Sequence, residues 1–267
     1  GIILYDETIR QADKNGKKFT EILKEKKIDI GIKVDQGLID FPDHPSEKIT
    51  QGLTGLAERL REYKSMGATF AKWRCVYNIS ETTPSEDLMR ENASTLAKYA
   101  LTCQEAGMVP IIEPEILIEG EHSIEQCDKV TRRNFEILFP ELAALGVFMP
   151  GIILKTSMVI SGKSAPDRAP AEKVAEMTIS CLVDKVPSDI GGIVFLSGGQ
   201  SEEEATIHLD LKHKSGNLPW NLTFSYSRAI QNPVLKYWAD NRGDPAGAQK
   251  IFLARAQASS LASVGKY

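Results

Sequence analysis

The sequence predicts an α/β fold in which a parallel β-sheet is covered by helices. Short runs of apolar, β-branched residues alternate along the whole chain with longer segments in which apolar residues recur every three or four positions. The 267 residues suffice to bury a sizeable core. Hydrophobic residues make up 42% and charged residues 25%, an ordinary globular composition that excludes collagen-like and disordered chains.

Seven strands are expected, each as a short apolar run, at residues 1–5, 28–34, 69–73, 108–112, 151–154, 192–196 and 221–224. A closed (β/α)8 barrel needs eight strands. The count therefore leaves two alternatives, an open doubly wound sheet or a barrel with one unit absent. Because the sequence begins inside a strand and without Met, we expect the absent unit to precede Gly1.

The segments between the strands have helical patterns. Ser201 and Glu204 are spaced as a capping box that opens one helix, and residues 248–263 form the last helix. Two apolar stripes with a period near 3.6 mark further helices, one through Met89, Ala93, Leu96, Ala97 and Ala100 and one through Val174, Met177, Thr178, Cys181 and Leu182. No linker or change of composition interrupts the chain, so residues 1–267 are expected to form a single domain.

Charge and cysteine usage narrow the class of protein. Lys and Arg total 32 against 36 Asp and Glu, a net charge of −4, so no extended nucleic-acid or anionic membrane surface is expected. The four cysteines contain no C-x-x-C pair, which suits reduced thiols in a cytoplasmic protein. The histidines, placed in polar loops or on helix surfaces, lack the H-x-H and H-E-x-x-H groupings of metal enzymes, so no metal site is expected.

Charged or glycine-rich segments follow the predicted strands at regular intervals. Positions 33, 72, 113, 155 and 197 are separated by 39, 41, 42 and 42 residues, about one strand–helix unit each. The carboxyl ends of parallel strands share one face, and that face carries the active site of such folds. A pocket rich in cations on that face would take an anionic substrate. The candidates are Lys33, Lys72, Arg74, Glu113, Glu115, Lys155, Ser197, Gly198, Gly199 and Arg228.

Each candidate also has a purely structural interpretation. Lys33 and Arg228 could be solvated surface cations, and Glu113 and Glu115 a charge pair in a loop. The segment 197–199 could be an ordinary glycine-rich turn, although its amides at a helix N-terminus suit a phosphate. Lys155 is the sharpest candidate, because it follows three apolar residues and lysine is seldom buried without a role.

Seven segments of the sequence together resemble class I fructose-1,6-bisphosphate aldolases, the metal-independent enzymes that use a lysine Schiff base. In chain order they are GIKVDQG, QGLTGLAERLREYKSMGATFAKWRCV, VPIIEPEIL, GIILKTSMVISG, GIVFLSGGQSEEEA, LTFSYSRA and SLASVGKY. The resemblance implies a TIM (β/α)8 barrel, of which this chain holds seven strands. It also implies that the family's first βα unit and C-terminal tail lie outside residues 1–267, so that the chain is a segment of a longer enzyme.

The resemblance implies a role for each candidate residue. Lys155 is the Schiff-base lysine, Glu113 is the acid–base carboxylate, and Lys72 is a catalytic residue beside Lys155. The remaining residues bind substrate, with Ser225 added by its motif: Lys33, Arg74, Glu115, Ser197, Gly198, Gly199, Ser225 and Arg228. No cofactor is implied.

The implied reaction is the reversible cleavage of fructose 1,6-bisphosphate into dihydroxyacetone phosphate and glyceraldehyde 3-phosphate, in glycolysis or gluconeogenesis. Phosphorylated ketoses and trioses are the expected partners, and the resemblance implies a homo-oligomer, commonly a tetramer. Two alternatives stay open, preference for another ketose phosphate and an inactive barrel retained as a binding scaffold. LKTSM stands where the family has LKPNM, and Ser227 stands where SYGR has Gly, which could crowd a phosphate-binding amide.

Overall fold

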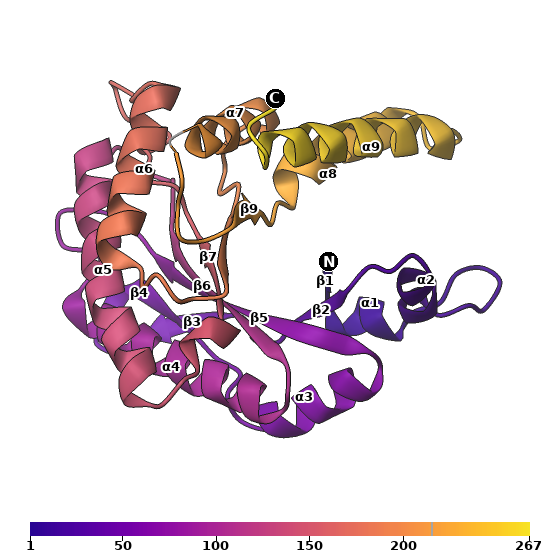
Figure 1. Ribbon diagram of the computed structural model, residues 1–267, viewed down its shortest axis with the longest axis horizontal. Helices are drawn as coiled ribbons and strands as arrows, with labels where there is room; N and C mark the ends of the chain where they lie inside the picture. The colour runs from indigo at the N-terminus through magenta and orange to yellow at the C-terminus, as the bar shows by residue number, and fades with distance from the viewer. Residues whose placement is uncertain (215) are drawn as a thin grey trace.

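The computed structural model describes residues 1–214 and 216–267 and contains a seven-stranded parallel sheet. The strands pair in the order in which they follow one another along the chain. They are β1 (Ile2–Leu4), β2 (Ile30–Lys33), β5 (Ala68–Tyr77), β6 (Val109–Ile116), β7 (Ile153–Thr156), β8 (Gly192–Phe195) and β9 (Leu222–Phe224). The sheet is curled, and within the described ranges its end strands β1 and β9 do not pair with each other (Figure 1).

Helices cover the convex side of the curled sheet (Figure 1). Those that follow the central strands are α3 (Leu56–Ser65), α4 (Glu86–Glu105), α5 (Ile124–Ala144), α6 (Ala171–Lys185) and α7 (Glu202–His213). The short helices α1 (Asp6–Arg10) and α2 (Phe19–Glu25) follow β1, and a 3-10 turn, Met149–Gly151, precedes β7. The chain ends with α8 (Arg228–Asp240) and α9 (Pro245–Ala262). No helix in the described ranges combines the length and apolar character needed to cross a bilayer.

The two-residue period of the strands separates core residues from site residues. On β5, Ala71 and Trp73 are fully buried, and the Trp73 ring packs against Tyr99 of α4 with the ring centroids 5.5 Å apart. The alternate residues point to the concave side. There, a cavity of about 500 Å³ is lined by residues from both edge strands and from β5, β6, β7 and β8, among them Ile3, Phe70, Ile111, Ile153, Val194 and Thr223. The charged residues described below follow these apolar residues by two positions on β5, β6 and β7.

All seven expected strands are present, but two are longer than predicted. Arg74 lies inside β5, and Glu113 and Glu115 lie inside β6, instead of following those strands. The prediction ended these strands too early because it placed Arg74 and Glu113 after the buried apolar segments. It likewise placed Lys155 after a strand, whereas Lys155 lies inside β7. These charges are tolerated inside strands because each has a partner of opposite charge at hand.

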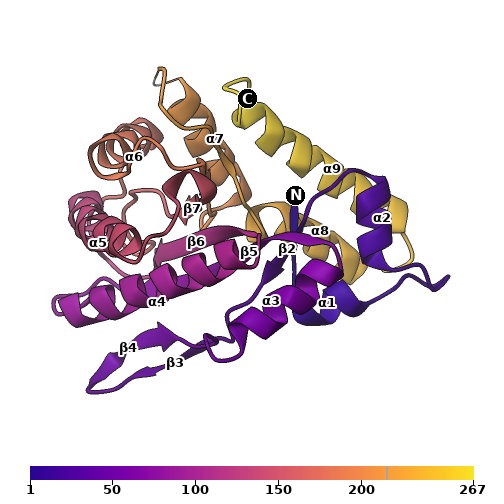
Figure 2. The same cartoon turned by 60° about the horizontal axis from the view of Figure 1, so that its bottom comes forward.

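A hairpin, β3 (Leu38–Phe41) and β4 (His44–Thr50), was not predicted. Figure 2 shows it projecting beside α4. Its residues are mostly exposed, so its sequence lacks the apolar run that marked the other strands. The hairpin is tied to the sheet by the Thr50 hydroxyl, which donates to the Arg74 carbonyl at 2.7 Å. The predicted capping box at Ser201 and Glu204 is confirmed, with both reciprocal hydrogen bonds present.

Candidate active site

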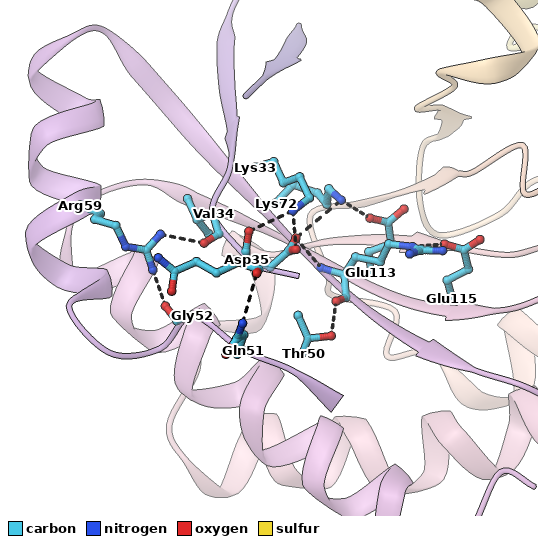
Figure 3. Close-up of polar contacts among 12 residues, drawn as sticks. Lys33, Val34, Asp35, Thr50, Gln51, Gly52, Arg59, Lys72, Glu113 and Glu115 are labelled. Carbon is cyan, nitrogen blue, oxygen red and sulfur yellow. Dashed lines mark hydrogen bonds and ion pairs between the residues drawn. The ribbon is translucent and has the colours of Figure 1, made fainter. Parts of the chain in front are cut away.

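Four neighbouring strands bring their charged residues together on the concave side of the sheet. Lys33 ends β2, Lys72 lies on β5, Glu113 on β6 and Lys155 on β7. The strand register places Lys33 directly opposite Lys72 and Arg74 directly opposite Glu113. Figure 3 shows the resulting row of contacts, which runs from Lys33 through Asp35 and Lys72 to Glu113.

Glu113 lies between two lysines. Its carboxylate is 2.7 Å from the Lys72 Nζ and 2.9 Å from the Lys155 Nζ, and the residue is only 3% exposed. Burial alone would raise the pKa of Glu113, but the two neighbouring cations outweigh it and hold the pKa below its usual value. The carboxylate therefore stays ionised and can accept a proton from a bound substrate group.

Lys155 is buried at the centre of the site, with 9% of its surface exposed. Burial lowers the pKa of its amine; the Glu113 carboxylate opposes this effect and the Lys72 ammonium adds to it, and the net shift is downward. A lowered pKa increases the fraction of neutral amine near pH 7. Neutral amine is the form that attacks a carbonyl carbon, so Lys155 has the properties of a nucleophile.

Asp35 belongs to the site although the sequence analysis did not select it. Its Oδ1 is 2.5 Å from the Lys33 Nζ, and its Oδ2 is 4.0 Å from the Lys72 Nζ. A signal was present in the segment GIKVD, because Asp35 stands two positions after Lys33 on an extended chain and so shares its side. The prediction selected the cations at the strand ends and overlooked Asp35, the carboxylate that pairs with Lys33 and Lys72.

Arg74 and Glu115 form a second ion pair beside this row, between the Arg74 Nε and the Glu115 carboxylate. Burial works against the charge on Arg74, but the bond to Glu115 prevails and raises the pKa of the guanidinium. The glycine-rich loop lies next to the pair, since a Cβ added to Gly198 would be 3.9 Å from the Glu115 Oε1.

The loop after β8 requires its glycines. Gly198 has φ +38° and Gly199 has φ +77°, both in the left-handed region. A Cβ at Gly199 would lie 2.7 Å from the Ile118 Cγ2, so a side chain there meets steric as well as backbone strain. Ser197 is buried immediately before these glycines, and the loop leads directly into the capped N-terminus of α7.

Ser225 and Arg228 follow the next strand. The Ser225 amide donates to the Phe195 carbonyl at 2.9 Å, which holds the end of β9 beside the end of β8. Arg228 is exposed at the first position of α8 and has no ion pair with the described residues. Ser227 has φ −112°, a backbone conformation open to any residue, and its hydroxyl donates to the Gln231 Oε1 at 2.9 Å. The serine therefore costs no backbone strain where the family motif has glycine.

The histidine placement expected from the sequence is wrong at two positions. His122 and His208 are each only 5% exposed, and the His208 Nδ1 is 2.6 Å from the Gln200 Oε1. Burial, with the Lys212 amine nearby, lowers the pKa of His208 to about 4. Polar neighbours in the sequence suggested a helix surface, but His208 lies on the face of α7 that packs inward.

The whole chain, residues 1–267, matches the family model described as "Glycolytic: Fructose-bisphosphate aldolase class-I". The chain belongs to this family. It is 49% identical over 268 residues to the probable fructose-bisphosphate aldolase class 1 of Xanthomonas campestris pv. campestris, with 100% of this chain and 80% of that protein covered. It is 45% identical over 269 residues to the fructose-bisphosphate aldolase of Dictyostelium discoideum, with 100% and 75% covered.

A solved structure supports the same assignment. It contains fructose-bisphosphate aldolase from Plasmodium falciparum in complex with TRAP and a small-molecule inhibitor. The present chain superposes on that structure with a TM-score of 0.97 at 44% sequence identity, and the match covers 99% of the present chain and 77% of the solved one. Agreement at that level confirms that the curled parallel sheet described above is a TIM-barrel-like fold.

Proposed function

We propose that this protein cleaves fructose 1,6-bisphosphate reversibly into dihydroxyacetone phosphate and glyceraldehyde 3-phosphate through a Schiff base on Lys155. One observation carries the proposal: a buried lysine amine of lowered pKa lies 2.9 Å from a buried carboxylate, which lies 2.7 Å from a second lysine. This arrangement supplies a nucleophile, a proton carrier and a fixed cation within one contact shell.

The chemistry follows from the positions of these groups. The neutral Lys155 amine adds to the C2 ketone, and Glu113 moves the protons that let the carbinolamine lose water. The resulting iminium withdraws electrons, so the C3–C4 bond breaks as the C4 hydroxyl loses its proton, and glyceraldehyde 3-phosphate leaves. The bond's electron pair remains as an enamine, which is protonated at C3. Water then hydrolyses the iminium to release dihydroxyacetone phosphate and free Lys155.

The phosphate groups are assigned to the cationic and glycine-rich parts of the site. Lys33 and Arg74 line the charged row, where Glu115 holds the Arg74 guanidinium in place. The loop through Ser197, Gly198 and Gly199 offers backbone amides at the start of α7, an arrangement that suits a phosphate. Ser225 and Arg228 are assigned to the same phosphate, since β9 lies beside β8.

Five finer features complete the proposal. The iminium acts as the electron sink, so turnover needs no metal ion. The fold is the eight-stranded barrel with seven of its strands in this chain, which is supported by a cavity lined by residues of both edge strands, β1 and β9. The protein works as a single domain in a homo-oligomer, a tetramer by resemblance to its family. It acts in the cytoplasm.

A coupled assay of fructose 1,6-bisphosphate cleavage tests the proposal. The protein is expected to turn over the substrate equally well with and without a chelator, and Lys155→Met is expected to lose more than about 10³-fold of that activity. Lys173→Met, which removes a solvent-facing lysine of α6, is the matched control and keeps the activity. Retention of activity in Lys155→Met, or its loss to the chelator, would contradict the proposal.

A further inference from the structure

Two cations of the site face each other across neighbouring strands. Lys33 on β2 and Lys72 on β5 are register partners, and both side chains lie on the concave side of the sheet. Like charges placed directly opposite each other on adjacent strands repel. Asp35 lies within ion-pair distance of both, so its carboxylate is the anion that these two lysines share.

The carboxylate of Asp35 is fixed from several sides. The Lys33 Nζ also donates to the Asp35 carbonyl at 2.9 Å, and the Arg74 amide donates to its Oδ2 at 3.4 Å. The flanking backbone is held as well: the Val34 amide donates to the Lys72 carbonyl at 3.1 Å, and the Gln36 amide to the Gln51 carbonyl at 2.9 Å. Figure 3 shows Asp35 beside Lys33 and Lys72. The side chain is only 4% exposed, so solvent does not screen it.

These contacts give the site a row of alternating charge: Lys33, Asp35, Lys72, Glu113 and Lys155. In this row, Lys72 is flanked by a carboxylate on each side. Among the described residues, Glu113 forms the ion pair with Lys155, at 2.9 Å, and no ion pair joins Asp35 to Lys155. The contacts that connect Asp35 to Lys155 therefore run through Lys72 and Glu113, which lie between them.

We infer that Asp35 is a positioning residue of the lyase site. Its carboxylate holds the Lys72 ammonium against Glu113 and, by pairing with Lys33, prevents Lys33 from displacing Lys72. The inference rests on the proposed function. Asn in place of Asp35 preserves the shape and the ability to accept a hydrogen bond but removes the charge. Lys72 would then be held by Glu113 alone and repelled by Lys33, and Glu113 would transfer protons from a displaced position.

A double-mutant cycle on the purified protein tests this inference. Asp35→Asn is expected to lower kcat for fructose 1,6-bisphosphate about tenfold or more, with KM changed less than about threefold. In a Lys72→Met background, the same substitution is expected to cost less than about threefold further, because the group that it positions is gone. The matched control is Asp40→Asn, which removes an exposed ion pair on the β3–β4 hairpin and leaves kcat unchanged.

The outcomes separate the two proposals. If the unsubstituted protein does not cleave the substrate, the proposed function fails. If it does, and Asp35→Asn turns over at the same rate, or costs about tenfold equally with Lys72 present and absent, the positioning role of Asp35 fails while the function stands.

A second variant covers the case in which Asp35→Asn does not fold. Asp35→Glu keeps the charge but moves it by one methylene group, so it should displace Lys72 less severely. We expect a loss of kcat of roughly three- to tenfold when Lys72 is present and no further loss in the Lys72→Met background. An unchanged kcat for Asp35→Glu in the presence of Lys72 would overturn the inference.

Discussion

At the scale of single residues, the proposed chemistry depends on an ionised Glu113 and a neutral Lys155. Burial and the neighbouring charges together set the pKa of each group. Burial favours the neutral form of both groups. Two lysines surround Glu113 and overcome this effect, whereas Lys155 has one carboxylate and one ammonium beside it, so burial decides its state. The same low-dielectric pocket therefore holds a charged carboxylate next to an amine that readily gives up its proton.

The rate of Schiff-base formation falls at low pH, where Lys155 is protonated. Replacing Lys72 with Met is expected to move this acid limb of the pH–rate profile to higher pH. Lys72 is one of the groups that lower the pKa of Lys155, so its removal lets that pKa rise, and the amine is neutral only at higher pH. The measurement is the rate of borohydride trapping with dihydroxyacetone phosphate as a function of pH. Lys48→Met, on the exposed hairpin, serves as control. A limb that stays in place or moves to lower pH would refute this reading of the site.

Glu113→Gln is expected to have the opposite effect on Lys155. The carboxylate raises the pKa of the amine, so its loss lowers that pKa further and trapping extends to lower pH. Turnover nevertheless falls, by about 10²- to 10⁴-fold, because the proton carrier is gone. The two readouts are the pH profile of trapping and kcat of cleavage. Turnover near that of the unsubstituted protein would mean that another group moves the protons.

Lys212 is a buried amine that the proposed reaction does not use. It is fully buried on α7, where its Nζ donates to the His208 carbonyl at 2.9 Å, contacts the Met158 Sδ at 3.0 Å and lies 5.0 Å from the Phe195 ring centroid. Burial lowers its pKa well below that of an exposed lysine. The unfolded chain therefore binds this proton more readily than the folded protein does, so stability rises with pH from the folded pKa up to the unfolded one.

Lys212→Met is accordingly expected to stabilise the protein at pH 7 by about 1–3 kcal/mol, since an apolar side chain of similar length needs no hydration. In this variant, the free energy of unfolding is also expected to rise less steeply as the pH increases towards the ordinary pKa of lysine. Denaturant unfolding at several pH values measures both effects. Lys173→Met, which removes a solvent-facing lysine of α6 paired with the exposed Glu176, is the control. Destabilisation by Lys212→Met at pH 7 would show that its polar contacts outweigh its burial.

At the scale of elements, the glycine-rich loop between β8 and α7 joins backbone conformation to substrate binding. Gly199→Ala would require a Cβ at φ +77° and 2.7 Å from the Ile118 Cγ2. We expect it to destabilise the protein by about 1–3 kcal/mol and to raise KM for the bisphosphate about tenfold, since the loop must move away from the phosphate. Gly216→Ala is the control. Gly216 also has a positive φ, but a Cβ added there meets open space, so this variant shows the effect of backbone strain without a steric clash. Equal KM values in both variants would contradict the loop's assignment.

The strands show what the sequence could and could not predict. The number and parallel direction of the strands, and the convergence of Lys72, Glu113 and Lys155, followed from the regular alternation of strands and helices, because the carboxyl ends of parallel strands share one face. The ends of β5 and β6 did not, because charged residues inside a buried strand are stabilised only by partners from other strands. The same limit explains Asp35, whose importance comes from Lys72 on a different strand, and His208, whose burial comes from helix packing.

At the scale of the whole molecule, the sheet order and the shared core favour one cooperative unit. Each strand pairs with the next along the chain, and the buried apolar residues form a core that extends from Leu4 to Ala262. We expect a single unfolding transition, with fluorescence and far-ultraviolet circular dichroism giving coincident midpoints. Two separated transitions would mean that the chain contains more than one domain.

The central claim is that the amine of Lys155 forms the covalent intermediate, and reductive trapping tests it most directly. The protein is incubated with dihydroxyacetone phosphate and borohydride, digested, and analysed by mass spectrometry. The expected result is one reduced adduct per chain on the peptide that contains Lys155, absent in Lys155→Met. An adduct on a different lysine, or none from protein that remains folded, would contradict the account.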